Sequence, residues 1–406
     1  MLVLIFHATA PPGAGPLVSA LADARRALAE RQRSAFLAAG ADVVEVVAGP
    51  PDALTFGERL TAEVAARNGA AGQRSDAAAG ASGATGRRGA AAAPPTAAAP
   101  LGGLIVLGSG SIPLATAADL RRLVEVAAEP GGHALANNRY SADVVAVSRA
   151  ADLVGLPPLP ADNALPRWLE ERAGVAVADL HLRWRLGVDV DTPLDLIVLR
   201  DPAAVRLLAA APLIGERLAA IADVMTNRRA ELLVAGRVSA TTLKWLERGV
   251  ACRVRALVEE RGLRAASRLA QAGAVGAAAD ATPHRPPRSV LGEVLDRDGP
   301  EALAQTVARL ADAAIVDTRV LMAHHYGVDE ATWPSPEDRF ASDLLLDATI
   351  ADPWLRALTS AAAAASSSTA SSATTASADH PILLGGHTLV NGGLRLLATR
   401  ARAGAR

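Results

Sequence analysis

Short apolar runs alternate with longer amphipathic segments through the first 200 residues, and this alternation restricts the fold more than any other feature of the sequence. Alternating strands and helices are typical of a parallel sheet whose strands are joined by covering helices. We therefore expect an α/β domain over residues 1–200. The predicted strands are Leu2–His7, Val43–Ala48, Leu104–Leu107, Val144–Ser148 and Leu182–Val188, and the predicted helices are Pro16–Ala39, Leu54–Arg67, Ala117–Ala128 and Leu165–Ala173.

The remainder of the chain has a different pattern. Long helical periodicities follow residue 201, without a convincing strand run, and a chain of 406 residues is long enough for two domains. The sequence predicts a mainly α second domain of unknown role over residues 201–406. Its predicted helices are Val205–Arg228, Ala240–Glu260, Glu301–Tyr326 and Arg339–Leu346.

Two segments have a composition unlike the rest. Residues 68–100 are rich in Gly, Ala, Ser, Arg and Pro without periodicity, and residues 361–377 consist of Ala, Ser and Thr. Such segments lack the apolar surface that a packed core requires. We predict disordered insertions at both places, and a Gly- and Pro-rich loop at Ala270–Ser289.

Charge and cysteine content exclude several classes of partner and location. The chain has 41 basic and 42 acidic residues, so no excess of positive charge favours nucleic acid. The single cysteine, Cys252, cannot form an internal disulfide and is interpreted as buried in the core. No apolar stretch reaches 18 residues. The sequence indicates a cytoplasmic protein without a membrane or nucleic-acid partner.

Glycine and serine are concentrated in two loops that follow predicted strands. Ligands of open α/β sheets bind at the carboxyl ends of strands, where small residues let the backbone approach a phosphate and a helix N-terminus offers free N–H groups. Simple Pro/Gly turns are the alternative, and capping explains Thr116 and Asp119. The candidate nucleotide-binding residues are Ala10, Pro12, Gly13 and Gly15 in the first loop and Gly108, Ser109 and Ser111 in the second.

Two further polar clusters are candidates for binding a substrate. Asn138 and Arg139 lie in the first, and Asp162 and Asn163 lie in the second. Amides and a guanidinium can orient a polar or anionic molecule, Arg139 by bidentate contact. Asx turns and helix capping explain the same residues without a ligand.

Asp189 and Asp191 are the candidate metal ligands. They lie two residues apart before a predicted helix start at Thr192–Asp195, and carboxylate oxygens suit Mg²⁺. The D-x-D spacing alone carries little weight, because the chain contains a second pair, Asp296 and Asp298. The first pair is favoured as a metal site because it lies directly before a capped helix, although the helix cap alone also explains the motif.

Two stretches of the chain are similar to a known protein family. Gly187–Leu196 resembles a run of Asp-Val-Asp-Thr-Pro-Glu-Asp-Leu, and Ile105–Leu114 with Thr116–Leu120 resembles an apolar strand followed by Asp-Leu-Pro-Leu and Thr-Pro-Glu-Asp-Leu. Both runs occur in nucleotidyltransferases of the molybdenum-cofactor guanylyltransferase and 2-phospho-L-lactate guanylyltransferase type. The resemblance covers residues 1–200. It implies a Rossmann-like, nucleotide-diphospho-sugar transferase-type sheet with helices on both faces.

By the same resemblance the activity is Mg²⁺-dependent transfer of a nucleotidyl group from a nucleoside triphosphate to a small phosphorylated metabolite, with Asp189 and Asp191 as catalytic metal ligands. Two positions depart from the family. Gly13–Leu17 lacks the Lys-x-Arg-Leu cations that hold the triphosphate, and Ser111 replaces a metal-binding Asp. The alternatives are a catalytically degenerate protein that binds a nucleotide or sugar phosphate or acts as a scaffold, and a glycosyltransferase that uses a nucleotide sugar.

Overall fold

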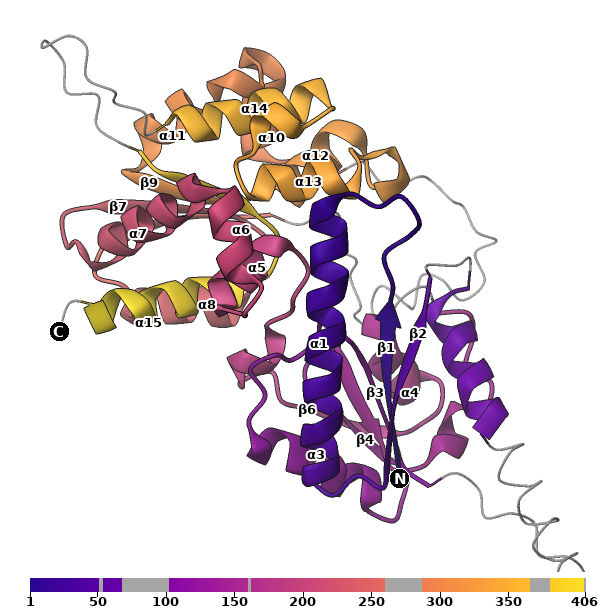
Figure 1. The fold of residues 1–406 in the computed structure, drawn as a ribbon. Coiled ribbons are helices and arrows are strands. Elements are labelled where there is room, and N and C mark those ends of the chain that lie inside the picture. Colours follow the sequence, from indigo (N-terminus) through magenta and orange to yellow (C-terminus); the bar gives the residue numbers. More distant parts are fainter. Residues whose placement is uncertain (51–53, 68–101, 160–161, 260–286, 366–379, 405–406) are drawn as a thin grey trace, which may run out of the picture. The chain divides into compact units, whose positions relative to one another are not determined.

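The structure, a computed structural model, describes residues 1–50, 54–67, 102–159, 162–259, 287–365 and 380–404 (Figure 1). It divides into two compact units. The first comprises Met1–Pro12 and Ala22–Asp189, and the second comprises Gly13–Leu21 and Val190–Arg406. Helix α1 (Pro16–Ala38) therefore begins in the second unit and ends in the first.

The first unit is built on a six-stranded sheet of order β2-β1-β3-β5-β4-β6. All neighbouring strands are parallel except at β5, which is antiparallel to both β3 and β4. The strands are β1 (Leu2–Ala8), β2 (Val43–Gly49), β3 (Leu104–Gly108), β4 (His133–Ala136), β5 (Val144–Val147) and β6 (Ala176–Asp179).

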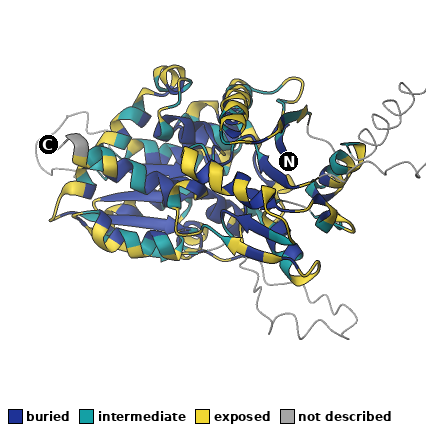
Figure 2. Ribbon diagram, turned by 90° about the horizontal axis from the view of Figure 1, so that it is seen from below, coloured by how far each residue is buried: buried dark blue, intermediate teal, exposed yellow. Residues whose placement is uncertain are grey.

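Helices cover both faces of this sheet, as the alternating sequence predicts. On one face, Phe36 of α1 and Leu123 of α3 (Ala117–Ala128) pack with Ile5 of β1. On the other, Leu60 of the helix at 56–67 and Leu169 of α4 (Leu165–Glu171) pack with Leu4. Successive residues of a strand point to opposite faces, so each strand supplies both cores. In Figure 2 the strands are buried and the outward faces of the helices are exposed.

Three details of the predicted first domain are wrong. The sheet is mixed because β5 is antiparallel. Strand β4 was not expected, and it forms a hairpin with β5. The last strand is β6 at Ala176–Asp179, whereas the segment predicted as a strand at Leu182–Val188 contains the 3₁₀ turn Trp184–Gly187. The segment Leu182–Val188 was predicted as a strand because its alternate residues are apolar, a pattern that a short turn can also produce.

The second unit contains a four-stranded parallel sheet of order β10-β9-β7-β8, so the expectation that residues 201–406 are mainly α, without a convincing strand run, is wrong. Its strands are β7 (Glu231–Gly236), β8 (Arg253–Val258), β9 (Ala313–Asp317) and β10 (Ile382–Gly385). Its helices are α5 (Pro193–Leu199), α6 (Ala204–Ala210), α7 (Pro212–Thr226), α8 (Ala240–Gly249), α10 (Val290–Asp298), α11 (Leu303–Leu310), α12 (Thr318–Tyr326), α13 (Pro336–Asp343), α14 (Pro353–Ala364) and α15 (Leu394–Gly404).

Two of these strands, β8 and β9, lie inside segments that were predicted as long helices. Strand β8 ends the segment Ala240–Glu260, and β9 divides Glu301–Tyr326 into α11 and α12. All residues of β9 are buried, so the strand is a continuous apolar run without the alternation that marks a half-exposed strand. The helix predicted at Val205–Arg228 is divided into α6 and α7 by Pro212, which occupies the first position of α7.

The predicted low-complexity insertion at 68–100 lies outside the described residues, as do 366–377 of the second insertion and most of the predicted loop Ala270–Ser289. The first residues of the second insertion are helical: Ala361 and Ala362 are buried in α14. Cys252 is buried as expected, and burial raises the pKa of its thiol to about 11. None of the helices in the described residues is both long and apolar enough to cross a membrane.

Candidate functional site

The first unit has a topological switch point between β1 and β3. From β1 the chain passes to β2 on one side, and it then returns to β3 on the other side of β1. Loops at the carboxyl ends of two such strands diverge and leave a crevice in which open α/β sheets bind ligands. The two loops that the sequence selects for nucleotide binding, after β1 and after β3, leave the sheet at this point.

A buried histidine joins the two strand ends, and the sequence did not single it out. His7 Nδ1 lies 3.0 Å from Ser109 Oγ, and the Ser109 N–H donates to the carbonyl of Phe6 at 2.8 Å. Burial, together with the charges of Arg26 and Arg25, lowers the pKa of His7. The imidazole is therefore neutral at pH 7, and Nδ1 can accept the serine proton in a hydrogen bond.

The loop after β3 is held in a strained conformation. Ile112 has a φ of 47°, in the left-handed region that β-branched residues rarely adopt, and its side chain is buried in the core. Gln32 Nε2 donates to the carbonyl of Ser111, while Gln32 Oε1 is buried and has no hydrogen-bond partner among the described residues. Backbone strain that the surroundings maintain is characteristic of ligand-binding loops.

The hairpin between β4 and β5 reaches the same edge, because β4 runs parallel to β1 and β3. Asn137 fixes this turn: its amide donates to Asp143 and to the Leu186 carbonyl, both at 2.7 Å. The predicted substrate residue Asn138 forms an Asx turn, in which its Oδ1 accepts the Tyr140 N–H at 2.9 Å. Arg139 forms an ion pair with Glu170 at 3.2 Å and donates to the carbonyl of Val177. Its charge is therefore already matched.

The other predicted substrate residues lie on a different element. Asp162 and Asn163 belong to the 3₁₀ turn Asp162–Ala164, directly before α4. Asp162 Oδ1 accepts the Asn163 N–H at 2.9 Å, and the N-cap residue of α4 is Ala164 rather than either of the two predicted. The four predicted substrate residues thus lie on two segments, the turn between β4 and β5 and the 3₁₀ turn before α4.

The two predicted metal ligands fall on either side of the boundary between the units. Asp189 ends the first unit, where its backbone forms an antiparallel bridge with Ser111, and Asp191 lies in the second. The bridge places Ser111 directly beside Asp189. The predicted capping box of α5 is confirmed: Thr192 accepts the Asp195 N–H, and Asp195 accepts the N–H groups of Thr192 and Asp191 at 2.7 and 2.9 Å.

No group of three or more His, Cys, Asp or Glu side chains in the described residues could hold a metal ion. Asp195 is committed to its capping role, which leaves Asp189 and Asp191 as the acids of the motif. Mg²⁺ is commonly held by one or two carboxylates together with substrate phosphates. The donor set therefore fits a metal that binds with a phosphorylated ligand, and it does not fit an all-protein metal cage.

The N-terminus of α1 differs from the prediction. We expected its N–H groups to be free for a phosphate, but those of Leu17 and Val18 each donate to the carboxylate of Glu337 at 3.0 Å. Glu337 belongs to α13, within the second unit. A carboxylate at a helix N-terminus satisfies both the unpaired donors and the helix dipole. The helix N–H groups that we expected to be free for a phosphate are thus occupied by the protein's own side chain.

The second unit has its own switch point, between β7 and β9, and the sequence did not predict it. Arg237 follows β7 and donates from Nε and Nη2 to the two carboxylate oxygens of Asp317, at 2.6 and 3.1 Å. Gly236, with a φ of +127°, permits this approach, because a Cβ there would lie 2.3 Å from Cβ of Asp317. Burial raises the pKa of Asp317, but Arg237 outweighs it and keeps that pKa below its ordinary value.

A second pair of charges lies beside the first. Arg319, at the start of α12, donates from Nη2 to Asp343 Oδ2 at 2.7 Å and from Nη1 to Asp343 Oδ1. Asp343 is fully buried and the Arg319 side chain is 9% exposed. Asn391 lies in the segment after β10. It accepts the N–H of Ser239, which follows β7, and donates to the His387 carbonyl. The matched acids and arginines of this edge stabilise the loops.

Comparison of the chain with protein-family models, with curated proteins and with solved structures gave no match.

Proposed function

We propose that the chain binds a nucleotide or another phosphorylated metabolite at the carboxyl edge of the first unit, and that Mg²⁺-dependent nucleotidyl transfer is the reaction this edge serves. One observation carries the proposal. The two small-residue loops that the sequence selects leave the sheet at its switch point, where His7 and Ser109 join them and Ile112 is strained.

In this proposal each group has a defined task. The backbone of residues 108–111 approaches the phosphates, and the neutral imidazole of His7 fixes the orientation of the Ser109 hydroxyl. Asp189 and Asp191 hold Mg²⁺, which neutralises phosphate charge when it is bound. The first loop contains no lysine or arginine between Ala8 and Leu17, so the metal and the backbone N–H groups must supply the neutralisation.

Binding and turnover are measured separately. Melting temperature and heat of binding are recorded with each nucleoside triphosphate, with Mg²⁺ alone and with both. We expect Mg²⁺ alone to have little effect and the combination to raise the melting temperature, because the metal needs phosphate oxygens as ligands. Asp191→Asn should remove the Mg²⁺-dependent part, and Asp298→Asn, in the chain's other D-x-D pair, serves as the control. If no triphosphate produces a response under either condition, the proposal is wrong.

A second candidate function is favoured by Glu337. Its carboxylate occupies the α1 N–H groups that would otherwise hold a phosphate, and a Cβ at Gly15 would collide with it at 2.3 Å. A protein that keeps this site filled is suited to bind a nucleotide or sugar phosphate without transferring it. The transferase candidate predicts pyrophosphate release from a bound triphosphate, whereas the binding-protein candidate predicts binding without release.

Substitution of Glu337 tests how its carboxylate affects ligand binding. Glu337→Ala frees the N–H groups of Leu17 and Val18 and removes a negative charge, so we expect nucleotide affinity to increase about tenfold, equivalent to about 1.4 kcal/mol. Titration calorimetry measures the change, and Glu330→Ala, on the 3₁₀ turn Glu330–Thr332, is the control for loss of a surface carboxylate. An unchanged affinity in Glu337→Ala would show that Glu337 is only a helix cap.

A further inference from the structure

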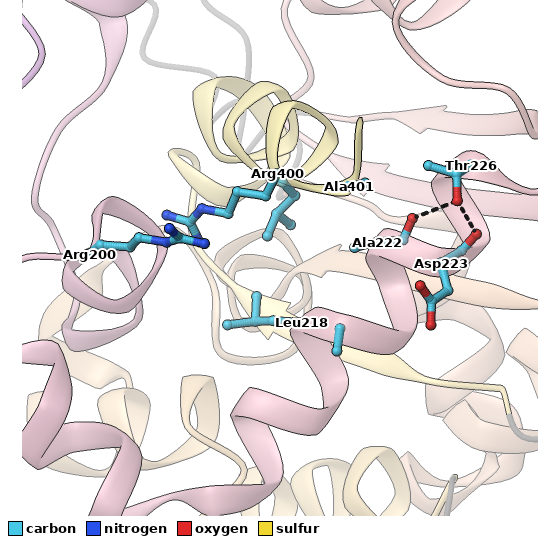
Figure 3. A pocket seen from close by; sticks show the side chains of 9 residues that line it. Arg200, Leu218, Ala222, Asp223, Thr226, Arg400 and Ala401 are labelled. Atoms are coloured by element: carbon cyan, nitrogen blue, oxygen red, sulfur yellow. Dashed lines mark hydrogen bonds between the residues drawn. The ribbon is translucent and has the colours of Figure 1, made fainter. Parts of the chain in front are cut away.

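A pocket of about 420 Å³ lies in the second unit, and none of the candidate site residues that the sequence selects lines it. Its apolar wall consists of Leu218, Ala219 and Ala222 from α7 with Leu397 and Ala401 from α15 (Figure 3). This volume falls within the range of small-molecule sites, which combine an apolar lining with a few polar groups. The polar groups of this pocket are two arginines, Arg200 and Arg400, and the pair Asp223 and Thr226.

The two arginines converge without an acid to neutralise them. Figure 3 shows the side chains of Arg200 and Arg400 pointing toward one another. Among the described residues neither guanidinium forms an ion pair, and Arg400 donates to the carbonyl of Val198 in α5. Burial and the charge of Arg200 lower the pKa of Arg400. Like charges held together are unfavourable, and a bound anion would remove this repulsion.

The backbone at Arg200 indicates that its side chain has a role of its own. Arg200 follows the last turn of α5 with a φ of 58°, and the N–H of Asp201 donates to the Leu196 carbonyl at 2.9 Å. This is the helix-ending position that glycine usually occupies, and a side chain there costs about 1–2 kcal/mol. Glycine would end the helix with less strain, so the capping geometry does not account for an arginine.

From these observations we propose that the pocket is a binding site for a small phosphomonoester. A phosphomonoester carries about two negative charges at neutral pH, which match the two guanidinium groups. The apolar wall accommodates a short carbon body. Asp223 and Thr226 lie at the other end of the pocket. The Thr226 hydroxyl donates its proton to the Asp223 carbonyl at 2.9 Å, so Thr226 Oγ1 and the Asp223 carboxylate can each accept a hydrogen bond from a ligand hydroxyl.

Calorimetric titration of the full-length protein with glycerol 3-phosphate tests this site, with glycerol as the neutral control. The titration is made with and without a saturating nucleoside triphosphate, so that the edge of the first unit does not contribute. We expect glycerol 3-phosphate to bind in both cases and glycerol not to bind. Binding should weaken from pH 7.5 to pH 5 because the phosphate takes up a proton and loses one negative charge. Binding that the triphosphate abolishes, or equal binding of glycerol, would overturn the proposal.

Two variants assign the binding to the pocket. Arg200→Gly removes one cation and relieves the left-handed strain, so the protein should fold at least as well as the wild type. Arg400→Gln removes the second cation. We expect each to weaken glycerol 3-phosphate binding about tenfold or more, while the control Arg206→Gln, on α6, has no effect. Wild-type affinity in the double variant would refute the site. Reduced stability of Arg400→Gln with unchanged affinity would show that Arg400 only caps α5.

Discussion

Replacing Arg319 with Met should lower the free energy of unfolding by about 3–5 kcal/mol, the largest effect we expect from a single side chain in this protein. Arg319 forms a two-pronged ion pair with Asp343, which is fully buried. Although burial opposes its charge, Asp343 raises the pKa of Arg319 above its ordinary value, so the guanidinium is charged at every accessible pH. Its removal leaves a buried carboxylate without its partner. Urea denaturation followed by circular dichroism measures the loss.

Two further variants separate the unmatched charge from the lost packing. The double replacement Arg319→Met with Asp343→Leu should restore much of the stability, because an apolar pair no longer contains a buried charge. Arg297→Met is the surface control: Arg297 pairs with Asp298 where the side chains are 72% and 44% exposed, and its loss should not change stability measurably. If the double variant were as unstable as the single one, packing rather than charge would explain the effect.

The second large effect concerns pH. Asp195 and Asp119 occupy the same position of two capping boxes, Thr192–Asp195 and Thr116–Asp119. Burial and the neighbouring charge of Asp191 raise the pKa of Asp195 to about 7. Burial also acts on Asp119, but hydrogen bonds from Thr116 and the charge of Arg183 outweigh it and lower the pKa. The equivalent aspartates of the two capping boxes therefore have pKa values shifted in opposite directions, upward for Asp195 and downward for Asp119.

Asp195→Asn should stabilise the protein at alkaline pH relative to the wild type. The folded pKa of Asp195 lies above its unfolded value, so its contribution is fully present below about pH 4 and decreases as the pH rises through about 7. Asparagine does not titrate and can accept the same N–H groups. The stability difference between variant and wild type should therefore shift by about 2–3 kcal/mol in favour of asparagine between pH 5 and pH 8, measured by denaturation at each pH.

Asp119→Asn is the matched control and should behave in the opposite way. Its lowered folded pKa means that Asp119 contributes stability at neutral pH, and that this contribution disappears as the pH falls through the folded pKa. The variant should be less stable than the wild type at pH 7 and equal to it in acid. Parallel pH profiles for the two variants would contradict the assignment of opposite shifts.

Local patterns of the sequence predicted much of the first unit. Helix α1 was expected at Pro16–Ala39 and is found at Pro16–Ala38, and both capping boxes are present. These features depend on residues within a few positions of one another: apolar spacing, a hydroxyl at the cap and an acid three residues later. The candidate loops after β1 and β3 were found in the same way, because a glycine- or serine-rich run followed a short apolar strand.

Interactions between distant residues could not be predicted in this way. His7 and Ser109 are 102 positions apart, and Arg237 and Asp317 are 80 positions apart, so no local spacing connects them. Glu337 reaches the N-terminus of α1 across more than 300 positions and fills a site that the sequence shows as open. Strand β9 is a short apolar run, and its pattern is equally compatible with a helix and a strand. Only its parallel pairing with β7 and β10 decides that it is a strand.

Local sequence patterns were enough to indicate that the first 200 residues form alternating strands and helices, and where polar loops interrupt them, because strand and helix periodicities are properties of neighbouring residues. The tertiary structure alone decided which strands are neighbours, and therefore where the two switch points lie. It also decided which charges are matched by a partner and which, like Arg200 and Arg400, converge on a pocket without one among the described residues. Strand order and charge pairing both depend on contacts between residues far apart in the chain, and no pattern of adjacent residues encodes them.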